Sequence, residues 1–460
     1  MRKTLGVLVG ILLTLGCSSQ PKIPPAAETP PPPSRSGTTH EEQKTSPEAP
    51  TALKDEQLDD RGDGLAKSLT LQRCIALALL QNPEVRSAKL LASAMRHRIR
   101  QASSFEDPTV MSVIGTEAGD SETMVGFSQK IPFPGKLSLR GKVAEEDANA
   151  AERLAQGVER RVLADVKKTY YNIYVAHKTI EVTKQNHILL ESLAKLAEVQ
   201  YEAGRGTKPD YLRAQVELSK LDDQLIRSEQ ELGTAEAKMN MLLSRPVNAP
   251  LSAPEDFKAT EVDVQIGAML EIASQSRPEL LALTHVVRRE EANKSLSILN
   301  FFPDPMVGFQ YMINEEMWEV TVATNVPLWY DRLTEGVREA KDMLAKSHAD
   351  YEQQKNLTFF EVKDAIVRVK TSERLVRLFR DTVIPQAKET FESSQSSYEV
   401  GKVDFLTVLD NWRGVLDFEL ELYRAQSGLE QNFAELERAI GADLTPQGQI
   451  KPSGGATHER

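Results

Sequence analysis

Cysteine and histidine, two residue types that often carry chemistry, are few and scattered in this chain of 460 residues. The two cysteines, Cys17 and Cys74, have no partner nearby, which excludes a disulfide framework and a four-cysteine zinc site. The seven histidines form no HExxH motif and no close pair, so no histidine metal site is expected. Gly135-Lys136 lacks the upstream glycine of a phosphate-binding loop, and no nucleophile motif stands out. The sequence therefore predicts no enzymatic activity, no cofactor and no metal site.

Cys17 is the residue with the clearest chemical context. Two basic residues precede an apolar run from Leu5 to Leu15, which is typical of a signal peptide at 1–16 and too short for a permanent membrane helix. The run ends in Leu-Thr-Leu-Gly-Cys and resembles a bacterial lipoprotein box, although Leu13 stands four residues before the cysteine instead of three. The resemblance implies cleavage before Cys17 and attachment of lipid chains such as palmitate. Ser18 rather than Asp follows, which fits an outer-membrane destination. The alternative is an ordinary secretory signal with an incidental cysteine.

Composition divides the rest of the chain into a folded body and flexible ends. Apolar residues make up 40% and charged residues 27%, as in globular proteins. The net charge is −11, and no block of Lys and Arg is present, which argues against nucleic acid as a partner. Residues 17–68 are rich in Pro, Ser, Thr and Glu, so we predict a lipid-anchored flexible tether there. We predict a flexible tail at 442–460.

The folded body consists of two similar copies. Four landmarks recur in the same order, and each second copy follows its first by 195 or 197 residues. The pairs are Asn82-Pro83 with Arg277-Pro278, Asp107-Pro108 with Asp304-Pro305, Ile131-Pro132 with Val326-Pro327, and Tyr201 to Gly204 with Tyr398 to Gly401. This order indicates an internal duplication, with a first repeat at 69–247, a linker at 248–260 and a second repeat at 261–441.

Each repeat contains the same predicted elements in the same order. They are a helix (69–103 and 264–299), two short extended segments (108–115 and 123–131; 305–313 and 317–327), a long helix (138–203 and 335–400) and a closing helix (209–244 and 405–441). From Leu154 to Ile180 the apolar residues step by three or four, and no proline interrupts 138–203. A helix of about 65 residues is roughly 100 Å long, which suits coiled-coil-like packing rather than a compact domain.

The extended segments of the second repeat alternate like membrane strands. Val307, Phe309 and Tyr311 share one face, and Trp318, Val320, Val322 and Val326 share one face of the next segment. The intervening residues are polar or small, a pattern typical of a transmembrane β-barrel strand. In the first repeat, Val125, Phe127 and Ile131 alternate in the same way, but 109–114 barely alternates. Four strands are too few to close a barrel, so we expect several copies to share one. The alternative is a pair of ordinary hairpins that cap a helical bundle.

The ordered set of elements over 69–441 resembles the TolC family of outer-membrane efflux ducts. The run from Ser128 to Lys136 is similar to the strand-to-helix corner of the family's heavy-metal efflux branch. The resemblance implies a mostly α fold whose long helical hairpins form an α-barrel. It implies a homotrimer in which each protomer lends four strands to a twelve-stranded transmembrane β-barrel. It also places Cys74 where a small residue is common, so we expect a buried packing residue there.

The same resemblance implies a place and a set of partners. The chain would be a passive duct in the outer membrane of a Gram-negative bacterium, anchored by lipid and with a long periplasmic extension. It would receive substrates from an inner-membrane pump through a periplasmic adaptor. The alternative function is a lipid-anchored periplasmic coiled-coil scaffold without a pore. No residue identifies the cargo, so metal ions, drugs and proteins all remain open, and we expect the pump to select.

The two breaks between long and closing helices resemble the family's periplasmic tips, where the adaptor docks. The residues concerned are Gly204, Arg205, Gly206 and Thr207 in the first repeat and Gly401, Lys402, Val403 and Asp404 in the second. Glycine suits a chain reversal that needs a positive φ, and the alternative is that these glycines only end helices. Asp404, Asp410 and Arg413 are candidates for a periplasmic gate, or alternatively for a solvated charged helix face. Pro209 has no counterpart in the second repeat, so we expect the tips to differ in shape.

Overall fold

The computed structural model describes residues 65, 68–117, 120–258, 260, 265–313 and 315–444, with side chains except at 114–117 and 120–122. These residues belong to one compact unit, Asp59–Arg460. The predicted signal peptide (1–16), Cys17 with nearly all of the tether, and all but the first three residues of the tail lie outside the described residues. In the described part of the chain, no helix is both long and apolar enough to cross a membrane.

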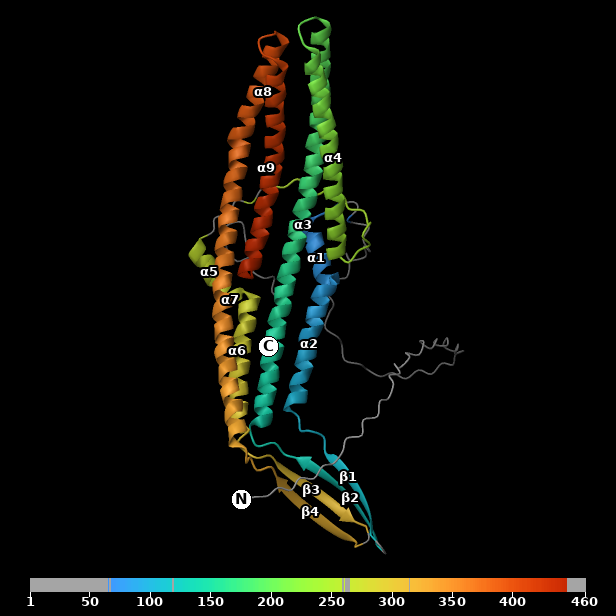
Figure 1. Ribbon diagram of the computed structural model, residues 1–460, viewed down its shortest axis with the longest axis vertical. Coiled ribbons are helices and arrows are strands. Elements are labelled where there is room, and N and C mark those ends of the chain that lie inside the picture. Colours follow the sequence, from blue (N-terminus) through green and yellow to red (C-terminus); the bar gives the residue numbers. More distant parts are fainter. Residues whose placement is uncertain are drawn as a thin grey trace, which may run out of the picture. The chain divides into compact units, whose positions relative to one another are not determined.

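The two repeats fold into matching series of elements (Figure 1). The first contains α1 (Leu71–Gln81), α2 (Pro83–Ser103), β1 (Thr109–Glu117), β2 (Asp120–Lys130), α3 (Lys136–Glu202) and α4 (Lys208–Leu242). The second contains α5 (Ile266–Ser276), α6 (Pro278–Leu299), β3 (Pro305–Met312), β4 (Met317–Thr324), α7 (Tyr330–Leu378), the π-helical turn η2 (Phe379–Val383), α8 (Ile384–Glu399) and α9 (Phe405–Ile440). The predicted mostly helical fold with four strands and an internal duplication is confirmed.

Our prediction of one continuous first helix in each repeat (69–103 and 264–299) is wrong. In both repeats the helix breaks directly before a proline. Asn82 and Arg277 have extended ψ angles of 122° and 118°, and a new helix starts at Pro83 and at Pro278. A proline disfavours the helical conformation of the residue before it but is well suited to a first helical turn. The Asn82 side chain also caps α2, since it accepts hydrogen bonds from the backbone N–H of Glu84 (2.9 Å) and Val85 (3.3 Å).

The two long helices differ from each other. Helix α3 runs unbroken for 67 residues, as the apolar spacing predicted, and is roughly 100 Å long. The equivalent stretch of the second repeat is not one α-helix, because the five residues of η2 interrupt it just before Pro385. The predicted continuous helix at 335–400 is therefore corrected to α7, η2 and α8.

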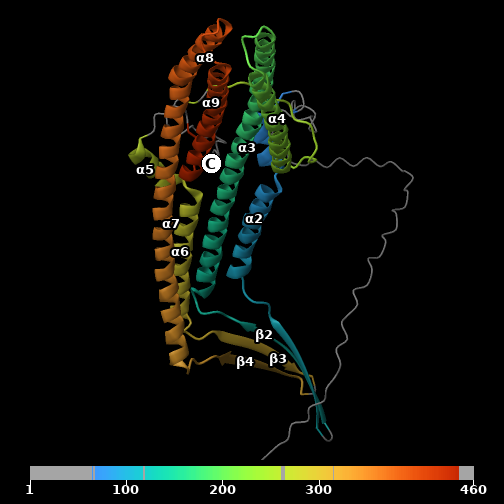
Figure 2. The same cartoon turned by 45° about the horizontal axis from the view of Figure 1, so that its top comes forward.

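Within this unit, the sheet lies at one end of the helices and the two helical turns at the other (Figures 1 and 2). Helix α3 packs against α2, α4, α6 and α9, so it joins the two repeats. Helix α9 packs against α7 and α8 as well as α3. Helices α3 and α4 form the hairpin of the first repeat, and α7, η2, α8 and α9 form the hairpin of the second. The packing of α9 against α3 therefore joins the two hairpins.

Among the described residues, apolar side chains form three clusters along the helices. An upper cluster, nearest the turns, joins both hairpins through residues such as Leu190, Leu221, Phe391 and Trp412. A lower cluster on the second repeat contains Val362, Ile366, Val369, Leu429 and Leu436. A third cluster on the first repeat contains Val166, Tyr170, Met239 and Cys74, which is fully buried as predicted. Burial raises the pKa of the Cys74 thiol to about 12, so it stays protonated and acts as an apolar packing residue.

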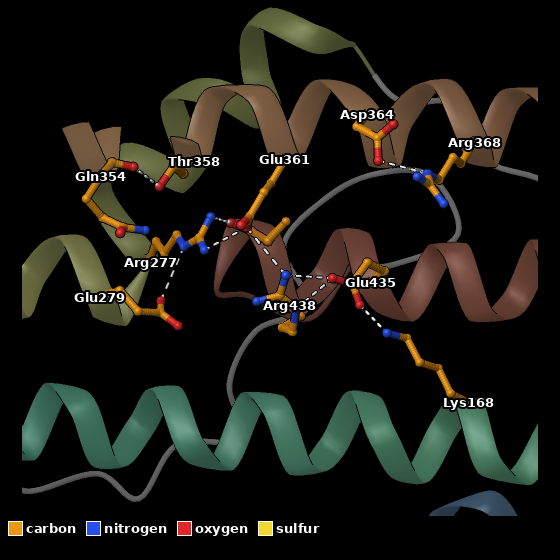
Figure 3. Close-up of polar contacts among 11 residues, drawn as sticks. Lys168, Arg277, Glu279, Gln354, Thr358, Glu361, Asp364, Arg368, Glu435 and Arg438 are labelled. Carbon is orange, nitrogen blue, oxygen red and sulfur yellow. Dashed lines mark hydrogen bonds and ion pairs between the residues drawn. The ribbon is translucent and has the colours of Figure 1, made fainter. Parts of the chain in front are cut away.

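An ionic network ties four helices together beside the lower cluster (Figure 3). The buried Arg277 at the α5–α6 break pairs with Glu361 of α7 at 2.7 Å, and Glu361 also contacts Arg438 of α9 at 3.4 Å. Arg438 pairs with Glu435 at 2.6 Å, and Glu435 pairs with Lys168 of α3. The network therefore fixes α3, α6, α7 and α9 relative to one another at this level.

Gly441 makes the closest backbone approach in this region and provides a stability prediction. It ends α9 with a φ of +76°, and a Cβ added there would lie 2.7 Å from both Arg277 Cα and Ser276 O. We expect Gly441→Ala to lower the free energy of unfolding by about 2 kcal/mol or more, through backbone strain and the steric clash. Thermal unfolding in detergent measures this. The matched control is Gly233→Ala in α4, where an added Cβ meets nothing within 4 Å; a loss of stability there as large as at Gly441 would contradict the argument.

Candidate functional site

The four strands form one antiparallel sheet in the order β1-β2-β3-β4, so the two repeats meet between β2 and β3. Phe127 of β2 stands opposite Phe309 of β3, and Phe309 stands opposite Val320 of β4. Their rings support this register, since Phe127 and Phe309 stack with centroids 6.2 Å apart. The predicted strand pairs are confirmed, although β4 ends at Thr324 and does not reach 327 as predicted.

The register gives the sheet one apolar face, rich in aromatic and β-branched residues, and one mixed face, which carries its charged residues and its glycines. Residues directly opposite each other share a face. The apolar face carries Val110, Val125, Phe127, Val307, Phe309, Tyr311, Trp318, Val320 and Val322. The other face carries the polar residues and glycines Gly126, Ser128, Lys130, Gly308, Gln310, Glu319 and Thr321, together with the apolar residues Met111, Val113, Met124, Met306, Met312 and Met317. The apolar residues are not covered by the chain: Trp318 is 65% exposed and Val322 is 71% exposed. A continuous exposed apolar face of this kind marks a contact with lipid or with another chain.

Both edges of the sheet are open within the described chain. Strand β1 pairs only with β2, and β4 pairs only with β3. Unpaired backbone groups in hydrocarbon cost several kcal/mol each, so such edges are not stable in a bilayer without a partner. A single copy of the chain therefore has an incomplete membrane element.

The corner between sheet and helices is fixed by a buried ion pair. Lys136 at the start of α3 donates from Nζ to Asp304 Oδ1 at 2.7 Å and to the carbonyl of Phe302 at 2.8 Å. Asp304 also accepts the backbone N–H of Phe133 at 2.8 Å. Burial alone raises the pKa of Asp304, but the hydrogen bonds from Lys136 and Phe133 bring it below its ordinary value. This contact joins the start of α3 to the start of β3 and so joins the two repeats.

We expect Asp304→Ala to destabilise the chain by about 3–5 kcal/mol, because it leaves the buried Lys136 ammonium without its partner. The pKa of Asp304 is lowered by folding, so this stabilisation is complete at neutral pH and is lost as the pH falls through the lowered pKa. Asp107 occupies the equivalent place in the first repeat but is exposed. Asp107→Ala should therefore change stability by less than about 0.5 kcal/mol. Equal effects of the two substitutions in denaturant unfolding would contradict the role of the ion pair.

The two helical tips follow nearly the same backbone path. Gly204 and Gly401 adopt φ angles of +71° and +74°, and the next residue of each turn donates to the carbonyl five residues earlier, from Arg205 to Gln200 and from Lys402 to Ser397. Pro209 lies in the first turn of α4, where it needs no N–H donor, so it does not disturb this shared path. The first tip has an additional bond, from the Gly206 N–H to the carbonyl of Gln200 at 2.9 Å.

The side chains of the two tips differ more than their backbones. Tyr201 is 46% exposed, whereas the equivalent Tyr398 is 7% exposed and packs against the ring of Phe405. Burial raises the pKa of Tyr398, and the Asp210 charge near the start of α4 raises it further. The second tip is therefore packed toward the first hairpin. Of the docking candidates, Gly206 and Val403 are partly buried, and the other six, including Arg205 and Lys402, are exposed.

Of the three gate candidates, the structure joins Asp410 and Arg413 and places Asp404 elsewhere. Asp404 caps α9, since Oδ1 accepts the backbone N–H of Thr407 at 3.1 Å. Arg413 donates to Asp410 one turn away at 3.1 Å. Arg413 also pairs with Glu217 of α4 at 2.8 Å, which links the second hairpin directly to the first. We call Glu217, Asp410 and Arg413 the clasp.

Glu217 is the member of the clasp that the sequence did not reveal. Its side chain is only 10% exposed, and it also accepts from Lys220 Nζ at 2.7 Å. Burial alone raises its pKa, but the hydrogen bonds from Lys220 and Arg413 bring the pKa below its ordinary value. A partly buried pair between two hairpins is worth more than an exposed pair within one helix.

No group of three or more His, Cys, Asp and Glu side chains in the described residues is placed to hold a metal ion.

Comparisons with known proteins agree with this geometry. The profile of the outer membrane efflux protein family matches residues 74–245 and 269–442, one segment in each repeat. The cobalt-zinc-cadmium resistance protein CzcC of Cupriavidus metallidurans is 21% identical over 392 residues, which cover 82% of this chain and 91% of CzcC. The probable efflux pump outer membrane protein TtgC of Pseudomonas putida is 21% identical over 401 residues, covering 81% and 82%. The solved structure of CusC has a TM-score of 0.74 at 18% identity and covers 87% of this chain and 98% of CusC.

The chain belongs to the outer membrane efflux protein family. The fold and the duplicated match confirm the resemblance to TolC-like ducts, and the chain is a transport protein of the outer membrane rather than an enzyme. The comparisons give no support to a scaffold without a pore.

Proposed function

We propose that three copies of this chain form a passive duct through the outer membrane. The observation that carries the proposal is the sheet, which has one exposed apolar face and two open edges. If β1 of one copy pairs with β4 of the next, three copies give twelve strands, every backbone group in the bilayer is paired, and the apolar face meets lipid. The mixed face, with Gly308, Gln310, Glu319 and Thr321 at its middle, then lines the bore.

The helices extend the duct through the periplasm. Their length of roughly 100 Å is far greater than a bilayer needs, so they serve to span an aqueous compartment. We assign the closed end to the tips, with the clasp as a gate between hairpins. Gly204, Arg205, Gly206, Thr207, Gly401, Lys402, Val403 and Asp404 are the proposed docking residues for a periplasmic adaptor that connects an inner-membrane pump.

The division of the chain into signal peptide (1–16), tether (17–68), first repeat (69–247), linker (248–260), second repeat (261–441) and tail (442–460) is part of this proposal. So is lipid attachment at Cys17. Incorporation of labelled palmitate that is lost in Cys17→Ser would support the anchor, and unchanged incorporation would contradict it.

For the cargo we propose only that the inner-membrane pump selects it. CzcC is named for resistance to cobalt, zinc and cadmium, and TtgC relatives are named for toluene efflux. A deletion strain tested against these metal ions and against toluene would separate the two classes.

The decisive experiment is on the purified mature protein. We expect trimers that survive detergent and conduct ions in planar bilayers. Monomers that stay in solution after removal of the lipid, with no conductance, would instead favour the coiled-coil scaffold.

A further inference from the structure

Methionine is concentrated on one face of the sheet. Five of the eleven methionines of the chain lie on the four strands, namely Met111, Met124, Met306, Met312 and Met317. Residues that stand directly opposite each other share a face, and so do residues two apart on one strand. The register therefore places all five methionines on the mixed face and none on the apolar face.

Three of these methionines form a row across three neighbouring strands. Met124 of β2 stands opposite Met312 of β3, and Met312 stands opposite Met317 of β4. Directly opposite residues have Cβ atoms about 4.5–5.5 Å apart, so these flexible side chains can bring their sulfur atoms to one point. We call Met124, Met312 and Met317 the methionine row.

The methionine row lies at the end of the sheet away from the helices (Figure 1). Strand β3 starts close to the end of α6 and finishes at Met312, and the pair of Met312 and Met317 is the last one before the turn to β4. In the proposed duct this end is the mouth that opens outside the cell, and the mixed face lines the bore. Whatever leaves the duct therefore passes the methionine row.

Burial does not explain the methionine row. Met317 is 48% exposed, and Met124 and Met312 are only partly buried. None of the three belongs to the apolar clusters that the described residues form, whereas Met239 and Met269 are buried members of those clusters. The methionine row therefore has accessible sulfur atoms, and its residues are not core residues.

Thioether sulfur is a soft, uncharged ligand. Soft ligands prefer soft cations such as Cu(I), whereas Mn²⁺ prefers oxygen ligands. Glu319 lies two residues from Met317 on the same face, and its negative charge favours a cation over an anion beside the methionine row. A site made of thioethers contains none of the His, Cys, Asp and Glu side chains on which our expectation of no metal site was based.

We propose that the methionine row is a binding site for a soft monovalent cation, Cu(I) or Ag(I), at the outer mouth of the duct. The position of the site at the mouth rests on the proposed duct, because only there does the mixed face line a bore. The ion binds and leaves in the same oxidation state, so no electron is transferred. The three sulfur atoms carry no charge, so nothing but coordination holds the ion and it can be released to the outside.

Silver binding to the purified trimer tests the site, because Ag(I) shares the charge and the sulfur preference of Cu(I) and is stable in air. We expect one tightly bound silver ion for each copy of the chain, with sulfur neighbours in X-ray absorption, and no competition from Mn²⁺. Met312→Leu removes the central sulfur at nearly constant volume. Loss of a group outside the ligand shell already weakens metal binding by about 10- to 100-fold, so we expect Met312→Leu to weaken silver binding at least ~10-fold. Met317→Leu, at a more exposed position, should do the same.

Met306→Leu is the matched control. Met306 lies on the same strand and the same face as Met312, but it stands opposite Lys130 and Ala323 instead of other methionines. We expect this variant to bind silver as the unchanged protein does. Cys74 is buried in the unchanged protein and is distant in sequence from every substitution, so its thiol does not account for a difference between the variants.

Equal silver binding by Met312→Leu and the unchanged protein would overturn the site, because leucine keeps the apolar surface and lacks only the sulfur. A loss of binding in Met306→Leu as large as in Met312→Leu would also overturn it, since the row would then have no special role. Conductance recorded in planar bilayers on the same preparations separates this result from failure of the duct. Conducting trimers that bind no silver reject only the methionine row, and protein that binds silver through the row without conducting rejects only the duct.

Discussion

Val320→Lys is expected to abolish most of the folded trimer. Val320 lies near the middle of β4 on the apolar face, opposite Phe309, and is 57% exposed in the single chain. A lysine at the middle of the lipid-facing surface of a membrane strand costs about 2–4 kcal/mol. A change of about 2 kcal/mol corresponds to a roughly 30-fold change in a folding equilibrium, and each trimer would contain three such lysines. The measurement is the amount of heat-resistant trimer in outer-membrane fractions.

The neighbouring residue provides the control. Glu319 lies on the opposite face of the same strand, beside Gln310, where the proposal places the water-filled bore. Glu319→Lys changes the charge by two units one position away, yet the trimer yield should stay close to that of the unchanged protein. If the two lysine variants yield equal amounts of trimer, the faces of the sheet are wrongly assigned and the membrane barrel is not supported.

The same alternation shows why much of this fold is predictable from the sequence. A period of two in residues 306–313 and a period near 3.6 in residues 154–180 each reflect an element with one apolar side, which is exposed in the strands and packed against other helices in α3, so the strand pairs and α3 are predictable. The break before Pro83 also has a local signal in the sequence, because a proline disfavours the helical conformation of the residue before it. That helix was predicted as continuous because its apolar spacing runs through Asn82 without a phase change. Here the local rule outweighed the periodicity.

Contacts between distant residues were not predictable in this way. Glu217 reads as one acidic residue among many on α4, and nothing near it in the sequence points to Arg413 of the other repeat. Duplication does not help, because equivalent residues have diverged in their contacts. Asp304 holds a buried lysine while Asp107 is exposed, although both precede a proline at the same place in their repeats. Burial is set by packing across the whole unit and leaves no local signature.

Arg413→Gln is expected to open the tip. The substitution removes the charge that joins α9 to Glu217 and leaves that carboxylate mostly buried with only Lys220 beside it. A partly buried pair of about 1–2 kcal/mol corresponds to a roughly 5- to 30-fold shift in the balance between closed and open states, and three clasps act in one trimer. We therefore expect the mean conductance in planar bilayers to rise at least ~5-fold. Glu217→Gln should have a similar effect, and the double substitution should add little, because the two residues act through one contact.

Acid should open the tip by the same contact. The folded chain holds the pKa of Glu217 below the ordinary value for a glutamate, which is about 4.3. The clasp is therefore intact at neutral pH. It weakens when the pH falls through the lowered pKa of Glu217. The Arg413→Gln trimer should lose this response. Arg227→Gln is the control, because Arg227 pairs with Asp223 on the exposed surface of the same helix α4 and joins no second helix. Conductance that rises equally in Arg227→Gln and Arg413→Gln would show that charge on the hairpins, rather than the link between them, keeps the duct closed.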